Sequence, residues 1–375
     1  MRTQLAKELG LEFPIFAFTH CRDVAAAVSK AGGLGVLGVA GHSLKDLKME
    51  LAWIENEVGD KPYGVDLLLP TKFVGSDRGG LGSDELDARI PDTHRRFVDE
   101  LLAAHDVPPL PLDAKVPSEF SVGYDQQRDV IELVFSHRIS LIASALGPPP
   151  PWMIERGRER GVKVAALAGT VEHARRHAEA GVDIVVAQGT EAGGHTGEVS
   201  TMVLVPEVVD AVAPLPVLAA GGIGNGRQVT AALALGAQGV WCGSVWLTTE
   251  EAETHPVVKE KFLRATSSDT VRSRSLTGKP ARQLRSAWTE AWDDPQSPDP
   301  LPMPLQPRLV GEAQIRIART AHKSPGAALL ANYFVGQIVG SLNEPASVRT
   351  VIESMVSEYA DTMERLDGWA AGAED

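Results

Sequence analysis

Residues 162–189 read VKVAALAGTVEHARRHAEAGVDIVVAQG and contain one complete structural repeat. Both ends are short apolar runs. The middle is charged, rich in alanine and spaced like a helix, and it ends on Gly181 as a helix cap would. The end runs are apolar throughout rather than alternating, which is typical of parallel strands covered on both faces. The stretch is therefore predicted to be a strand–helix–strand unit of an α/β protein.

The same alternation continues through the first 250 residues, where eight apolar runs occur. They are PIFAF from residue 14, LGVLGVA from 34, YGVDLLL from 63, ISLIAS from 139, VKVAALA from 162, DIVVAQ from 183, PVLAA from 216 and GVWCG from 239. Eight such units predict a (β/α)8 TIM barrel. The competing doubly wound sheet usually carries G-x-G-x-x-G after its first strand, whereas the clearest glycine clusters here follow the last three runs.

Two regions do not follow this repeat. Residues 71–123 are mixed and broken by glycine and proline, and they are predicted to be an insertion after the third strand, helical around residues 91–105. Residues 251–375 are predicted to be a polar, proline-containing linker and then, from about Ser324, a helical extension that packs on the barrel. The barrel domain is therefore expected over residues 1–250.

Composition limits the classes of function. The chain has 375 residues, with 36 Lys and Arg against 49 Asp and Glu, a formal net charge of −13. Such an acidic chain is not expected to bind nucleic acid, because phosphate backbones need a basic face. No run of about 18 apolar residues or signal-peptide pattern is present, so we expect no membrane span and a cytoplasmic location. Two cysteines, Cys21 and Cys242, are too few for a four-ligand zinc site, and no metal is expected.

Glycine clusters follow the last three predicted strands. Residues 188–197 read QGTEAGGHTG, residues 221–227 read GGIGNGR and residues 243–244 read GS. In a TIM barrel these loops share one face, where the loops after strands seven and eight commonly bind phosphate. Glycines let main-chain amides approach an anion, Asn225 can cap the next helix, and Ser244 adds a hydroxyl donor. Tight turns without a ligand are the alternative, but two consecutive clusters favour a phosphate site.

Residues 187–212, AQGTEAGGHTGEVSTMVLVPEVVDAV, and 216–247, PVLAAGGIGNGRQVTAALALGAQGVWCGSVWL, resemble the nitronate monooxygenase family, formerly called 2-nitropropane dioxygenases. They are also similar to the related flavin-dependent enoyl-thioester reductases. Weaker similarity covers AAAVSKAGGLGVLG from residue 25, PYGVDLLLP from residue 62 and GQIVG from residue 336. The resemblance implies a TIM barrel that holds one non-covalent FMN.

The resemblance also implies roles for individual residues. Gln188 would contact the flavin ring, and Gly193 and Gly194 would line it. The residues expected at the phosphate are Gly221, Gly222, Gly243 and Ser244. His195 occupies the position of the family's catalytic histidine. Imidazole suits proton movement near neutral pH. It could abstract the α-proton of a nitroalkane, orient a nitronate, or protonate an enolate after hydride transfer.

The chain departs from the family pattern in the strands that shape the pocket. Asp66 stands where the family usually has Asn, and an ionised carboxylate cannot donate a hydrogen bond as an amide can. Its flavin contact is therefore expected to be lost or made with ribityl hydroxyls. At the end of strand one, Phe18 is expected beside the cofactor, and His20 is either a pocket residue or a turn histidine. Ser144, in strand four, is a further candidate for the pocket.

Two other groups of charged or titratable residues are candidates for binding. His173 and His177 are spaced i, i+4, but the Glu of H-E-x-x-H is absent, so a solvated helix face is expected. Lys279, Arg282 and Arg285 lie in TGKPARQLR, a stretch that resembles a family segment after the barrel. They would either neutralise an anion, such as a nucleotide-bearing acyl carrier, or form a solvated basic stretch.

Three functions are compatible with these features. The first is FMN-dependent oxidation of alkyl nitronates, with O2 as acceptor, to a carbonyl compound and nitrite. The second is an NAD(P)H-dependent enoyl-CoA reductase on the same scaffold. The third is a flavin-binding protein without turnover. The expected partner is a small molecule, either a nitronate or an acyl-CoA, and a homodimer is one expected assembly.

Overall fold

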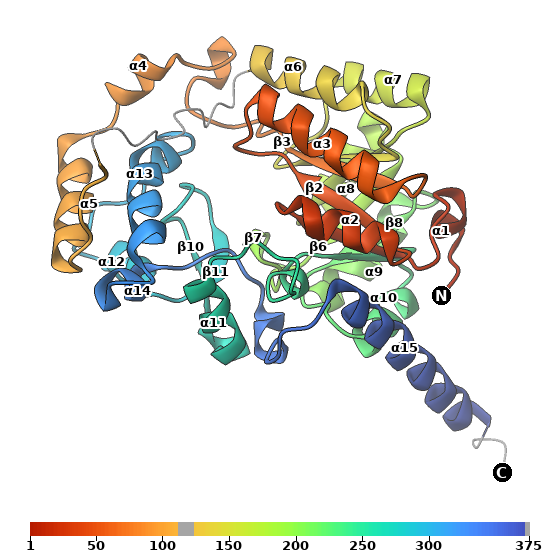
Figure 1. Ribbon diagram of the computed structural model, residues 1–375. Helices are drawn as coiled ribbons and strands as arrows, with labels where there is room; N and C mark the ends of the chain where they lie inside the picture. The colour runs from red at the N-terminus through yellow and green to blue at the C-terminus, as the bar shows by residue number, and fades with distance from the viewer. Residues whose placement is uncertain (112–123, 372–375) are drawn as a thin grey trace.

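The structure is a computed structural model that describes residues 1–111 and 124–371. Eight parallel strands form a closed barrel in the order β1-β2-β3-β4-β5-β6-β8-β9. Their bounds are β1 Ile15–Thr19, β2 Leu34–Gly38, β3 Tyr63–Leu68, β4 Leu141–Ala145, β5 Lys163–Ala168, β6 Ile184–Gln188, β8 Val217–Ala220 and β9 Gly239–Cys242. The strands coincide with the eight apolar runs, so the predicted TIM barrel is confirmed (Figure 1).

Helices cover the outside of the barrel. They are α2 Arg22–Lys30, α3 Leu44–Val58, α6 Tyr124–Phe135, α7 Pro151–Arg160, α8 Val171–Ala180, α9 Thr201–Val212 and α10 Gly226–Ala234. Thr170 caps α8, and Gly181 ends that helix with a φ of 91°. Asn225 Oδ1 accepts from the amide of Gln228 and starts α10, as predicted. At the N-terminal end of the barrel, α1 Gln4–Glu8 buries Leu5 against the interior core.

Side chains along the barrel strands alternate between the interior and the surrounding helices, as the period of two requires. Val36, Ala143 and Ala220 belong to the interior core. Phe18 pairs in register with Val36, Asp66 with Ala143, and Gln188 with Ala220. Phe18, Asp66 and Gln188 therefore also point inward, close to the C-terminal ends of their strands.

A second hydrophobic core lies beside the barrel mouth, and we call the elements around it the helical lobe. Its helices are α4 Ser83–Asp87, α5 Asp92–Ala104, α11 Pro256–Arg264, α12 Ala287–Asp293, α13 Leu305–Thr320 and α14 Pro325–Leu330. Figure 1 shows α4, α5, α12, α13 and α14 grouped to one side of the barrel. Arg308 links the late helix α13 to the early helix α4, because its Nε lies 2.6 Å from Oδ1 of Asp87. The helix predicted around residues 91–105 is α5, whereas residues 112–123 of the predicted insertion lie outside the described residues.

The region after the barrel contains more structure than a polar linker. Strands β10 Thr270–Ser273 and β11 Ala281–Leu284 form a three-stranded antiparallel sheet with β7 Gly194–His195. The helix predicted from about Ser324 ends already at Leu330. Asn332 Nδ2 then donates to Gln283 Oε1 at 2.9 Å, and Phe334 forms an antiparallel bridge with Gln283. These contacts hold the chain extended along β11 where the sequence predicted helix.

The last helix, α15 Val348–Ala371, returns to the barrel and packs against α10 and α2. Glu358 accepts from the amide of Gly226 at 2.8 Å and pairs with Arg227 at 2.7 Å. The C-terminal end of α15 projects away from the barrel in Figure 1. Short 3-10 helices are η1 Ser76–Arg78, η2 Ser244–Trp246, η3 Ser267–Asp269 and η4 Gln337–Ser341. Within the described ranges, no helix is both long and apolar enough to cross a membrane.

Candidate active site

One large cavity, of about 1270 Å³, lies between the barrel mouth and the helical lobe. Its walls come from the strand ends, from the loops after β6, β8 and β9, and from lobe residues. Every predicted site residue except Ser144 lines it. These residues are Phe18, His20, Asp66, Gln188, Gly193, Gly194, His195, Gly221, Gly222, Gly243 and Ser244. The fold thus gathers these predicted residues, from five of the eight barrel strands and the loops that follow them, around one space.

Main-chain amides gather at one end of the cavity, in the loops after β8 and β9. Among the described residues, no group accepts a hydrogen bond from the amides of Gly222, Ile223 or Ser244. Ser244 Oγ accepts from the amide of Gly336 at 2.7 Å, so its own proton is available to a ligand. Such amides need an acceptor, and a phosphate at the start of a helix supplies one. We call this group of amides the amide cradle, and it fits the phosphate of FMN.

The glycines of the amide cradle are needed for backbone shape. Gly221 and Gly222 have φ values of 103° and 70°, in the left-handed region that favours glycine. A Cβ added to Gly222 would lie 3.4 Å from Cβ of Glu191. A Cβ added to Gly193 would lie 2.8 Å from the amide nitrogen of Gly336. The loop after β6 is therefore packed directly on the late GQIVG segment, which explains why both are glycine-rich.

The barrel mouth next to the amide cradle is largely aromatic and apolar. The rings of Phe18 and Trp241 are stacked, with centroids 6.4 Å apart and an interplanar angle of 20°. Gln188 and Asp66 are the polar side chains that point inward from β6 and β3. A flat apolar surface with a few polar groups suits a planar heterocycle such as a flavin ring.

His195 lies in β7, where its backbone pairs with Ala281 of β11. Its Nε2 lies 2.9 Å from Thr277 Oγ1, and the Thr277 hydroxyl donates to the carbonyl oxygen of Lys279 at 3.2 Å. This network assigns the proton to Nε2 and leaves Nδ1 as the acceptor. Burial, with a smaller contribution from the Lys279 ammonium, lowers the pKa of His195 to about 4. The imidazole is therefore neutral near pH 7 and can accept a proton.

The two weaker candidates for the substrate pocket lie in different environments. The ring of His20 faces the cavity, its Nδ1 is 2.9 Å from the carbonyl oxygen of Gly38, and burial lowers its pKa. Ser144 is fully buried, and its hydroxyl donates to the carbonyl oxygen of Gly147 at 2.8 Å. The hydroxyl of Ser144 is thus used in shaping the loop after β4, and the residue is not part of the cavity wall.

The basic stretch TGKPARQLR does not act as one patch. Lys279 lines the cavity, and burial lowers the pKa of its ammonium. Arg282 is only 8% exposed, and its guanidinium donates to Thr190 O at 2.8 Å and to Thr270 Oγ1 at 3.0 Å. It therefore supports the loop that carries His195. Arg285 is not among the cavity-lining residues, so Lys279 supplies the positive charge of this stretch in the cavity.

Several cavity residues were not predicted from the sequence. Thr277 holds His195, and Tyr333 and Phe334 line the cavity from the extended segment after α14. The ring centroids of His195 and Phe334 are 6.3 Å apart. The signal in the sequence was weak, because Thr277 lies 82 positions from His195 and the aromatic pair belonged to a predicted helix.

The predicted solvated face of α8 is wrong for one of its two histidines. His177 is only 3% exposed, and its Nε2 lies 3.0 Å from the carbonyl oxygen of Leu167. Burial lowers its pKa. The ring therefore packs against β5, and its Nε2 is held by the main chain of that strand.

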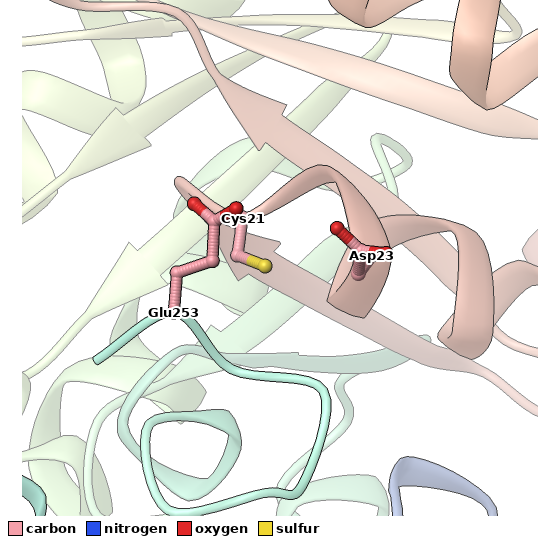
Figure 2. A group of neighbouring side chains, drawn as sticks. All are labelled: Cys21, Asp23 and Glu253. Carbon is pink, nitrogen blue, oxygen red and sulfur yellow. The ribbon is translucent and has the colours of Figure 1, made fainter. Parts of the chain in front are cut away.

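Figure 2 shows a group formed by Cys21, Asp23 and Glu253, of which Cys21 and Glu253 also line the cavity. Their potential metal-ligating atoms all lie within 4.8 Å of one another. Burial raises the pKa of the Cys21 thiol, and the thiol donates to the carbonyl oxygen of Glu251 at 3.3 Å. A metal ligand would have to be the thiolate, so these contacts favour a protonated thiol over a metal centre.

Comparison with known sequences gives consistent matches along the chain. A family model described as nitronate monooxygenase matches residues 5–358. Rv1533 of Mycobacterium tuberculosis, provisionally named a monooxygenase, is 61% identical over 372 residues, which cover 98% of this chain and 99% of the relative. A Staphylococcus saprophyticus protein named "Probable nitronate monooxygenase" is 30% identical over 384 residues and covers 97% and 99% of the two chains.

Solved structures are also similar to this chain over nearly its whole length. The nitroalkane oxidase from Streptomyces ansochromogenes superposes with a TM-score of 0.79 at 25% identity, covering 96% of this chain and 99% of that one. FabK from Thermotoga maritima superposes with a TM-score of 0.72 at 28% identity, covering 98% and 99%. The similarity therefore includes the lobe as well as the barrel.

Proposed function

The chain belongs to the nitronate monooxygenase family, and on that basis we propose that this enzyme uses FMN and O2 to oxidise alkyl nitronates to a carbonyl compound and nitrite. Flavin-dependent oxidoreductase chemistry is common to the family and its structural neighbours. The proposal concerns the cofactor, the substrate and the residues that act on them. A cytoplasmic location and a homodimer stay predictions.

One observation carries the proposal: the amide cradle and the neutral imidazole of His195 line the same cavity. The amides of Gly222, Ile223 and Ser244 would hold the phosphate. Gln188, Phe18 and Gly194 would line the ring. His195 and Lys279 would face the substrate from the opposite wall. This division separates binding of the cofactor from proton transfer.

His195 is suited to proton transfer from carbon. Thr277 Oγ1 accepts a hydrogen bond from the Nε2–H of His195, so the unprotonated Nδ1 can remove the α-proton of a neutral nitroalkane. When the substrate arrives already as a nitronate anion, the Lys279 ammonium supplies the opposite charge and His195 orients it. The aromatic residues Tyr333 and Phe334 add apolar surface to one side of the cavity. Bound FMN supplies the electron acceptor, and O2 completes the conversion.

A second candidate, reduction of an enoyl thioester with NAD(P)H, is favoured by the size of the cavity. A volume of about 1270 Å³ exceeds the usual range of small-molecule pockets, about 300–1,000 Å³. Its wall includes Thr277, Lys279 and Pro280 of TGKPARQLR. Such a space could take an extended acyl group beside the flavin. The structural likeness to FabK supports this candidate.

The visible spectrum and anaerobic reduction of the purified protein test the proposal. A flavin spectrum that is bleached by an alkyl nitronate, but not by NADPH, is the expected result. Bleaching by NADPH alone would support the enoyl-thioester reductase instead. A yellow protein that neither compound reduces would support a flavin-binding protein without turnover. A colourless protein that does not take up added FMN would contradict all three.

A further inference from the structure

Asp66 places a buried carboxyl group in the barrel mouth, and no residue that the structure describes forms a hydrogen bond with its Oδ2. It lies near the C-terminal end of β3, in register with Gly38 of β2 and Ala143 of β4, and its side chain points into the barrel. The residue is 5% exposed and lines the cavity. Within the described part of the chain, its buried Oδ2 has no hydrogen-bond partner.

The surroundings of Asp66 are unfavourable for a negative charge. Its register neighbours are Gly38 of β2 and Ala143 of β4, and the same cavity is lined at the barrel mouth by Phe18, His20, Ala145, Gln188 and Trp241. Of these only His20 titrates, and desolvation lowers its pKa, which disfavours the positively charged form. Burial alone raises the pKa of Asp66 well above its usual range. A buried carboxylate without a cation or donor is costly, so the neutral acid is favoured.

We propose that Asp66 remains a neutral carboxylic acid at physiological pH and donates a hydrogen bond to an acceptor atom of the FMN ring. This inference rests on the proposed function, because it takes FMN to be the group that the cavity holds. It replaces the expectation of an acceptor-only carboxylate. A protonated carboxyl has one donor and one acceptor on adjacent atoms, as the edge of an asparagine amide does. The neutral acid can therefore make the pair of hydrogen bonds that an amide side chain makes at such a position.

The protonation state is tested directly by infrared spectroscopy of the full-length protein, as purified and after removal of flavin. The carbonyl stretch of a protonated carboxyl should be present at pH 7 and shift in D2O. It should be absent from Asp66→Asn, which assigns the band among the other carboxyls. In the wild type the band should disappear only when the pH is raised well above the usual aspartate range. A wild-type spectrum without this band at pH 7 would overturn the inference.

The contact with FMN is tested by the pH dependence of FMN affinity. Asp66→Asn keeps the shape and the donor, so its dissociation constant for FMN should match the wild type within about twofold at pH 6–7, because one hydrogen-bond donor replaces another at the same position. Above the pKa of Asp66 the wild type should lose affinity by up to about tenfold per pH unit relative to the variant. The ratio of the two constants cancels titration of the FMN phosphate, His20, His195 and Lys279, since all are present in both proteins.

Each outcome of this experiment has a distinct meaning. A ratio that stays constant across the pH range would overturn the proposed contact, whatever the infrared result. Asp66→Leu, which removes the donor, should weaken FMN binding at all pH values, and unchanged binding by this variant would also overturn the contact. If no form binds FMN, the proposed function fails together with the contact. A protonated-carboxyl band in that case shows that Asp66 is a neutral acid even though the cavity does not hold FMN.

Discussion

The two ends of the cavity are built from different parts of the protein. The amide cradle is made of main-chain groups in loops that directly follow β8 and β9, and it is supported by α15 and η4. The opposite wall is made of side chains, such as Thr277, Lys279 and Phe334, from segments far along the chain. A main-chain site tolerates little change in backbone shape, whereas a side-chain wall can change one residue at a time.

This difference explains why the cofactor is easier to infer than the substrate. Glycine is needed at Gly221 and Gly222 by their positive φ values, so the motif is visible in the sequence. The wall that would contact the substrate depends on how the lobe packs, and its residues carry no local pattern. If this comparison is right, changes at the two ends should separate cofactor binding from turnover.

The largest expected effect is on turnover, from the side-chain wall. His195→Asn should lower kcat by about 10²–10⁴-fold, because it removes the proton acceptor. The bound flavin should remain, since the amide cradle is untouched. Steady-state kinetics and the visible spectrum of the same preparation measure both. His94→Asn, on α5 outside the cavity lining, is the matched control. Unchanged turnover in His195→Asn would remove the imidazole from the mechanism.

The next effect is on the amide cradle. Gly222→Val places a branched side chain at a φ of 70°, a strain of about 1–3 kcal/mol, so FMN affinity should fall about tenfold or more. Fluorescence titration with FMN measures this. Gly161→Val is the control, because Gly161 has a φ of 67° at the end of α7, away from the cavity. Gly161→Val should lower Tm without changing FMN affinity, and equal losses of affinity in both variants would contradict a local effect.

A smaller effect is expected from the residue that holds His195. Thr277→Val removes the acceptor of the hydrogen bond from Nε2 of His195. Such a bond contributes about 0.5–1.5 kcal/mol, so kcat should fall about 2–10-fold with FMN affinity unchanged. Thr277→Ser keeps the oxygen and should restore most of the rate. If the serine variant were as slow as the valine variant, packing rather than the hydrogen bond would account for the loss.

The smallest expected effect is on the acid side of the pH profile. The pKa of His195 is lowered to about 4, so the imidazole stays a free base down to about pH 5, and His195 should cause almost no loss of kcat/KM between pH 7 and 5.5. The lowered pKa of His195 also affects stability. The unfolded histidine takes up a proton near pH 6.5, whereas the folded histidine does so only near pH 4, so the free energy of unfolding should decrease as the pH falls from about 6.5 towards 4. Half-loss of activity near pH 6.5 that disappears in His195→Asn would contradict the lowered pKa.

Local patterns in the sequence were sufficient to predict the barrel and one end of the site. The eight apolar runs, the cap at Asn225 and the glycines after β8 each depend on neighbours only a few positions away. The helical lobe could not be predicted, because it joins α4 and α5 to helices about 200 positions later. The ion pair of Asp87 with Arg308, 221 positions apart, is one such link.

Asp66 and the segment after α14 show how the tertiary environment bears on local expectations. The acceptor-only role expected for Asp66 assumes an ionised side chain, whereas burial raises the pKa of Asp66 and favours the neutral acid that we propose. The segment at Tyr333 and Phe334 has apolar residues in helical spacing, yet the bond from Asn332 to Gln283 fixes it along β11. In both places the tertiary environment outweighs the local tendency.

The support of the amide cradle by α15 has a consequence for biosynthesis. The amide of Gly226 is held by a carboxylate of Glu358, 132 residues later in the chain. When the barrel strands have left the ribosome, α15 and its Glu358 have not yet been synthesised. Flavin capture should therefore follow completion of the polypeptide rather than accompany it, and chains that terminate before α15 should retain flavin poorly.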